Sequence, residues 1–193
     1  MKLKPYSALL VALLLALSAT AQTDYALKSV KASIKGTSTL HDWESNITKI
    51  EWKGVSKADQ NALIMIQNVE VKVPVKSIKS KEGSIMDNKT YDAFKEPSNP
   101  YIIYTSSTPK VTQKANNVFS IEAPGNLTMA GTTKSITLKA NGKVLDNGDL
   151  NFTISQKLKM TEYNMKPPTA VLGTIQVGDE VTVLFDVTLT RTN

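Results

Sequence analysis

The chain has 193 residues, of which 41% are apolar and 21% charged, a composition typical of one globular domain or at most two small ones. It has no cysteine and one histidine, which excludes a disulfide framework, a thiolate nucleophile and a cysteine-ligated metal, and argues against a histidine-built metal site. The net charge of +6 suits an anionic partner, but scattered lysines fit a solvated surface equally well. With one arginine, Arg191, and no aromatic–basic platform, we expect no nucleic-acid partner.

The N-terminus has the pattern of a signal peptide. Lys2 and Lys4 precede an apolar run over 8–17, and small residues with A-x-A spacing end at Ala21. Ten apolar residues are too few to span a bilayer, which takes about 20. We therefore expect cleavage after Ala21, a signal peptide over 1–21 and one soluble domain over 22–193 that is periplasmic or secreted.

Apolar and polar residues alternate through most of the remaining chain, the period of half-buried β-strands. The last segment is the clearest, because its odd positions are all apolar and its even positions are polar except Leu184. The predicted strands, in chain order, cover 30–35, 47–54, 69–76, 101–104, 118–121, 135–140, 150–160 and 181–190.

One segment departs from this period. Apolar residues over 84–94 approach helical spacing, and Pro97 and Pro100 follow, so we predict one short helix there. Residues 146–149 predict a tight turn, and Gly178-Asp179 predicts a hairpin before the last strand. Many alternating strands joined by tight turns indicate an all-β antiparallel sandwich or barrel. About eight such strands would form a barrel whose lumen is filled by side chains or holds one elongated ligand.

Four segments carry a resemblance to a known family. Residues 125–134 resemble the G-x-L-T-x-x-G-x-T-K hallmark of the YceI-like, polyisoprenoid-binding periplasmic proteins, and residues 36–43, 86–102 and 177–181 are similar to further parts of that family. The resemblance covers essentially the whole mature chain. It implies a lipocalin-like antiparallel barrel with a helix at one end, whose lumen holds an isoprenoid, a quinone tail or another long-chain amphiphile. The chain departs from the family in its first strand, where the usual "H-S-x-I-x-F" is replaced and the histidine comes later, at His41.

The candidate lumen residues are those on the apolar face of each strand. They are Ile34, Val69, Val71, Phe119, Ile121, Leu127, Met129, Ile136, Leu138, Phe152, Ile154, Leu158, Val183, Phe185 and Val187. Any β-protein core shows the same alternation, so a ligand-free structural or interaction module of the cell envelope remains the alternative to a lipid carrier that serves carriage, storage or stress protection. We expect no metal and no cofactor other than a bound lipid.

His41, Asp42 and Trp43 form the one local cluster of side chains that could recognise a polar group or take part in a reaction. We expect His41 and Trp43 at the barrel mouth, in contact with a ligand head group, or alternatively a plain turn in which Asp42 and Ser45 cap backbone amides and Trp43 packs on the barrel end. A triad of Ser38, His41 and Asp42 is disfavoured, because residues this close in one turn rarely reach the required geometry. We therefore expect no catalytic site.

A group of lysines lies mostly at outward positions of the predicted strands. We expect them to form a solvated face, or alternatively to make transient contact with an anionic membrane surface. They are Lys28, Lys31, Lys35, Lys72, Lys76, Lys79 and Lys81. The oligomeric state, monomer or homodimer, is left open by the sequence.

Overall fold

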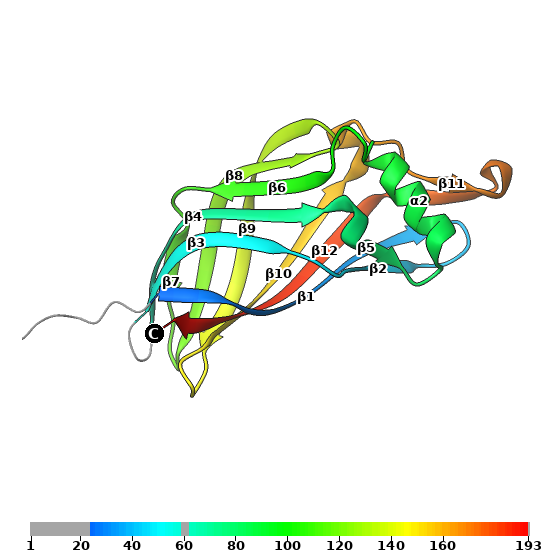
Figure 1. Ribbon diagram of the computed structural model, residues 1–193. Coiled ribbons are helices and arrows are strands. Elements are labelled where there is room, and N and C mark those ends of the chain that lie inside the picture. Colours follow the sequence, from blue (N-terminus) through cyan, green and yellow to red (C-terminus); the bar gives the residue numbers. More distant parts are fainter. Residues whose placement is uncertain (1–23, 59–61, 193) are drawn as a thin grey trace, which may run out of the picture.

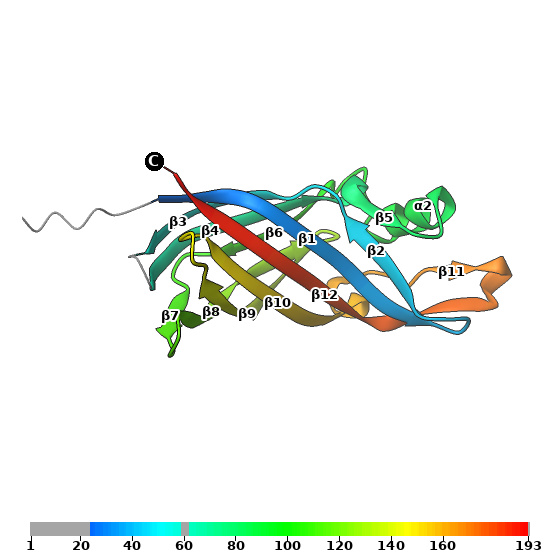
Figure 2. The same ribbon diagram turned by 90° about the horizontal axis from the view of Figure 1, so that it is seen from below.

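The computed structural model describes residues 24–58 and 62–192 (Figures 1 and 2). The predicted signal peptide over 1–21 lies outside these residues. Strands dominate, and the described chain has one α-helix, close to the predicted bounds of 84–94. The strands are β1 (Asp24–Ser38), β2 (Trp43–Ile47), β3 (Glu51–Ala58), β4 (Leu63–Pro74), β5 (Ile78–Ser80), β6 (Tyr101–Ser106), β7 (Lys110–Gln113), β8 (Val118–Met129), β9 (Thr132–Val144), β10 (Leu150–Lys159), β11 (Thr169–Ala170) and β12 (Ile175–Thr192). The helices are α2 (Ser84–Ala93) and the 3-10 turns η1 (Val75–Ser77), η2 (Met160–Tyr163) and η3 (Val171–Gly173).

All the strand pairs are antiparallel, and together they form one curled sheet around a central core. Its hydrogen-bonded order is β3-β4-β6-β8-β9-β10-β12-β1-β2-β5, with β7 beside β8 and β11 beside β12. Figure 1 shows α2 and β11 at one end of this curled sheet and the C-terminus at the other. Among the described residues, no helix is both long and apolar enough to cross a membrane. The predicted all-β, antiparallel, lipocalin-like architecture with one short helix is confirmed.

The strand β12 shows how the sequence produces this architecture. Val181, Val187 and Leu189 are buried on the inner face, whereas Asp186 on the outer face is exposed. This strand pairs with β1 on one side, from Asp24 to Ser38, and with β10 on the other. Because its inner residues gain burial from both neighbours, the alternating pattern is stabilised across three adjacent strands.

Several local predictions are corrected by the structure. There are more strand segments than the eight expected. The predicted strand over 47–54 is interrupted at 48–50, so it belongs to both β2 and β3. The predicted strand over 69–76 ends at Pro74, because η1 begins at Val75. Gly178-Asp179 lies inside β12, and the chain reverses earlier, where Val171, Leu172 and Gly173 all have positive φ.

The hallmark segment over 125–134 forms the hairpin between β8 and β9. Ala130 and Gly131 at its tip both have positive φ, as a two-residue type I′ turn requires. The hydroxyls of Thr128 and Thr133 lie 2.8 Å apart across the strands. Gly125 is required for a different reason, since a Cβ there would lie 2.2 Å from the carbonyl oxygen of Thr105 on β6.

The end of the sheet opposite α2, here called the closed end, is packed solid. Phe119, Leu150 and Leu189 are fully buried there. The predicted turn over 146–149 joins β9 to β10 at this end, with Gly148 at φ +82. The hydroxyl of Tyr25 donates to the Gly148 carbonyl at 3.0 Å and accepts from Arg191 Nε at 3.2 Å, which ties β1 and β12 to this turn.

Candidate functional site: an apolar cavity within the sheet

The curled sheet encloses a cavity of about 420 Å³. Twelve of the fifteen predicted lumen residues line it: Ile34, Val71, Leu127, Met129, Ile136, Leu138, Phe152, Ile154, Leu158, Val183, Phe185 and Val187. Val69, Phe119 and Ile121 are buried but are not among the lining residues. Alternation identified their inward face correctly, but it carries no information on how far along a strand the cavity extends.

Strand register divides one wall of the cavity into layers. Directly opposed residues on antiparallel neighbours share a face and a height. From the closed end upward, the successive layers are Leu150–Leu189–Leu27, Phe152–Val187–Val30, Ile154–Phe185–Ala32–Ile47–Ile78, Gln156–Val183–Ile34–Ser45–Ser80 and Leu158–Val181–Gly36–Trp43. The lowest layer forms the floor of the cavity, because Leu150 and Leu189 are fully buried and do not line it.

The turn between β1 and β2 lies at the other end of the cavity, here called the mouth. Ser38, Leu40, His41 and Trp43 all line the cavity, as expected for His41 and Trp43. The indole Nε1 of Trp43 donates to the Thr37 carbonyl at 3.0 Å, and its ring lies against Gly36. These contacts fix the tryptophan as part of the mouth.

The local capping differs from the turn we expected. Ser38, rather than Asp42 or Ser45, caps the turn, since its hydroxyl accepts from the amides of Leu40 and His41 at 3.2 Å. The same hydroxyl lies 2.7 Å from the His41 carbonyl, and His41 Nδ1 lies 2.7 Å from the Asp42 carbonyl. Ser38 and His41 thus engage backbone oxygens, an arrangement unlike a nucleophile–base–carboxylate triad.

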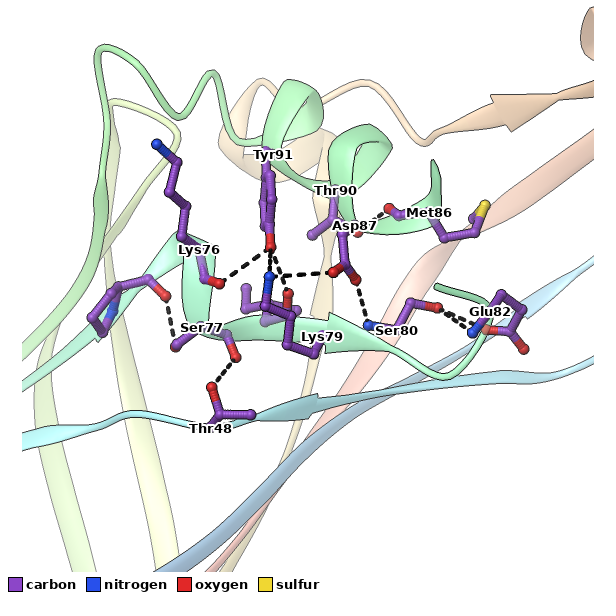
Figure 3. A network of polar contacts seen from close by, with 12 residues as sticks. Thr48, Lys76, Ser77, Lys79, Ser80, Glu82, Met86, Asp87, Thr90 and Tyr91 are labelled. Atoms are coloured by element: carbon purple, nitrogen blue, oxygen red, sulfur yellow. Dashed lines mark hydrogen bonds and ion pairs between the residues drawn. The ribbon is translucent and has the colours of Figure 1, made fainter. Parts of the chain in front are cut away.

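Helix α2 lies beside the mouth and is fastened to β5 and η1 by polar contacts (Figure 3). The carboxylate of Asp87 accepts from the Ser80 amide at 2.7 Å and pairs with Lys79 at 3.3 Å. The Tyr91 hydroxyl accepts from Lys79 Nζ at 2.6 Å and lies 3.1 Å from the Lys76 carbonyl. The hydrogen bond to Tyr91, followed by the one to Asp87, raises the pKa of Lys79. The helix is therefore held in place while Met86 and Phe94 line the cavity.

The lining includes side chains outside the fifteen predicted lumen residues. Trp52 of β3, Tyr104 of β6 and Met160 and Met165 around η2 belong to it. Tyr104 lay in a predicted strand too short to reveal its inward face. The Tyr104 hydroxyl donates to the Ala123 carbonyl at 2.5 Å, and burial raises its pKa.

Charge is concentrated outside the cavity. Glu82 is the only carboxylate among the lining residues of the described chain, and no lysine or arginine is among them. Six of the seven outward lysines form ion pairs, Lys28 with Asp149, Lys35 and Lys81 with Glu44, Lys72 with Glu70, Lys76 with Glu96 and Lys79 with Asp87. Hydrogen bonding to Lys81 is the first cause of the lowered pKa of Glu44. Most of the positive charge on these lysines is therefore paired with carboxylates.

An antiparallel sheet curled around an apolar cavity, with a helix at its mouth, defines the lipocalin-like class of folds. The chain belongs to the YceI-like domain family, which matches residues 19–189.

Solved structures share this fold at low sequence identity. BcnA of Burkholderia cenocepacia is 17% identical with a TM-score of 0.62, over 83% of this chain and 96% of that one. A polyisoprenoid-binding domain of Saccharophagus degradans, implicated in plant cell wall breakdown, is 9% identical with a TM-score of 0.63, over 88% and 98%. The YceI protein of Campylobacter jejuni is 20% identical with a TM-score of 0.52, over 76% and 85%.

A curated protein of a different kind also matches. The alanine–tRNA ligase of Candida albicans is 23% identical over 141 residues, which is 72% of this chain. The chain spans 12% of the length of that ligase.

Proposed function

We propose that this protein binds an isoprenoid-like lipid, or another long-chain amphiphile, in the cavity within its sheet. The observation that carries the proposal is the cavity itself, whose lining is almost entirely apolar. Its volume of about 420 Å³ lies within the range of roughly 300–1,000 Å³ typical of small-molecule sites. The similarity in fold to a polyisoprenoid-binding domain supports the same ligand class.

The volume sets the size of the ligand. An apolar cavity of about 150 Å³ holds one benzene, so by proportion 420 Å³ holds roughly 15–20 carbon atoms. At about 0.8 kcal/mol per buried CH₂, such a chain gains roughly 12–16 kcal/mol before the costs of ordering and association are subtracted. This gain supports strong binding without any catalytic or covalent contribution.

The biological role that we propose is that of an exported carrier or storage protein without catalytic activity. The export pattern over 1–21 and the YceI-like family support a periplasmic or secreted location. A site whose lining offers almost no ionisable groups suits retention of an apolar molecule rather than acid–base chemistry.

Two neighbouring residues of β12 provide the test. Val183 points into the cavity, whereas Leu184 lies on the outer face in a shallow surface groove, and both are half-buried. We expect Val183→Trp to fill the cavity and lower the affinity for a C20 isoprenoid alcohol at least tenfold, while Leu184→Trp leaves it unchanged. Affinity is measured by titration, and native protein is extracted with organic solvent for mass spectrometry. Absence of a stoichiometric apolar ligand from native protein, together with no binding of the alcohol, would favour the ligand-free envelope module.

A further inference from the structure

A belt of polar side chains crosses the apolar wall of the cavity one layer below the mouth. Gln156, Ser45 and Ser80 share the layer of Val183 and Ile34. The layer beneath consists of Ile154, Phe185, Ala32, Ile47 and Ile78, and the layer above contains Leu158, Val181 and Trp43. The polar residues are thus placed at one height inside an otherwise apolar wall.

The hydrogen-bonding capacity of this belt is only partly used. Ser45 is 4% exposed and lines the cavity. Gln156 donates from Nε2 to the Lys157 carbonyl at 2.8 Å, and its Oε1 makes no bond within the same residues. Ser80 is already engaged, since its hydroxyl lies 2.7 Å from Glu82 Oε2. Because Ser45 and Gln156 both line the cavity, they are positioned to bond to a polar group of a molecule inside it.

The charges around the belt define what kind of polar group it accepts. No lysine or arginine lines the described cavity, and the one carboxylate that does, Glu82, would repel an anion. Lys134 is on the cavity-facing side of β9 by alternation with Ile136 and Leu138, but it is exposed and outside the lining. A phosphate or carboxylate at the belt would therefore be buried without a counterion, at a large cost.

We infer that Ser45 and Gln156 bind the head group of the ligand, and that this head group is an uncharged hydroxyl, carbonyl or amide with the apolar chain extending toward the closed end. This inference rests on the proposed function, since it assumes that a lipid occupies the cavity. It specifies the ligand as a neutral amphiphile rather than a phosphorylated isoprenoid or an ionised fatty acid.

Four probes with one C20 branched chain test the inference: phytanol, phytane, phytanic acid and phytanylamine. Trp43 and Trp52, the two tryptophans of the chain, both line the cavity, so their fluorescence reports binding. At neutral pH we expect phytanol to bind about 100-fold more tightly than the ionised acid, because the carboxylate finds no counterion in the belt.

Variants assign this preference to the belt. We expect Ser45→Ala and Gln156→Leu each to weaken phytanol binding about 2- to 10-fold, the worth of one neutral hydrogen bond. Both variants should bind phytane as the unmodified protein does, which also shows that they are folded. Ser155→Ala is the matched control, since Ser155 is the exposed neighbour of Gln156 on the outer face of β10 and should change neither affinity.

The remaining outcomes overturn the inference in distinguishable ways. If the acid binds as tightly as the alcohol and Lys134→Gln weakens it, the head group is anionic, and only the proposed function stands. If the amine binds more tightly than the alcohol, or if all variants bind phytanol equally well, Ser45 and Gln156 do not bind a neutral head group. If none of the four probes binds, the proposed function fails together with the inference.

Discussion

Phe152 sets the depth of the cavity, and its removal should lengthen the ligand that fits. It is 5% exposed, lies opposite Val187 and Gly142 on the two neighbouring strands, and lines the cavity one layer above the floor at Leu150. Phe152→Ala removes a six-carbon ring at the closed end. By the volume that benzene occupies in an apolar core, the cavity gains up to roughly 150 Å³, space for about one further isoprene unit.

The energetic consequence can be worked out for a ligand one unit longer. Five additional buried carbons contribute about 4 kcal/mol before ordering costs, so we expect the variant to bind a C25 isoprenoid alcohol about 10- to 100-fold more tightly than the unmodified protein does. The variant should lose about 3 kcal/mol of unfolding free energy, near the lower end for a buried phenylalanine, because the ring already borders a cavity.

The assay compares dissociation constants for farnesol, geranylgeraniol and geranylfarnesol, with 15, 20 and 25 carbons. For the unmodified protein, affinity should rise from C15 to C20 and then level off, whereas for Phe152→Ala the rise should continue to C25. If affinity for Phe152→Ala levels off at the same chain length as for the unmodified protein, Phe152 does not limit chain length and the reasoning is refuted.

Three further predictions concern the frame around the cavity. Gly125→Ala should lower the free energy of unfolding by about 1–3 kcal/mol in urea denaturation, because its Cβ would overlap the Thr105 carbonyl and the Tyr104 hydroxyl; an unchanged midpoint would contradict this packing. The Lys28 ammonium lowers the pKa of Asp149, 2.7 Å away, so the pair stabilises the fold above the normal carboxyl pKa of about 4 and loses its effect as Asp149 is protonated at lower pH. Lys28→Met should therefore cost about 1 kcal/mol at pH 7 and progressively less below pH 4, and a difference independent of pH would argue against the pair. Tyr25→Phe should cost about 1 kcal/mol of stability by removing the bond to Gly148, yet leave ligand affinity within twofold, since Tyr25 does not line the cavity; a large loss of affinity would show that the closed end is coupled to the site.

The correct and incorrect predictions divide along physical lines. Alternation in β10 and β12 located Phe152, Ile154, Val183 and Phe185 on the cavity side, because a period of two fixes which face of a strand is buried. The same rule could not separate Val71, which lines the cavity, from Val69, which is packed below it. Both are inward residues of β4, and only the packing of the closed end determines where the cavity stops.

Turns show the same division. The reversal over 146–149 was predictable because Gly148 supplies its own positive φ. The reversal before β12 was misplaced, since Val171 and Leu172 adopt positive φ at positions where their side chains disfavour it.

The sequence by itself determined the class of fold, the inward faces of the strands, the short helix and the turn over 146–149, because each depends on neighbours within a few residues along the chain. The tertiary structure alone decided the height of each residue within the wall. Gln156 interrupts an apolar face in the sequence, but its meeting with Ser45, 111 positions away, arises from the register of β10, β12, β1 and β2. Register between strands is fixed by packing and hydrogen bonding across the whole sheet, and no single segment encodes it.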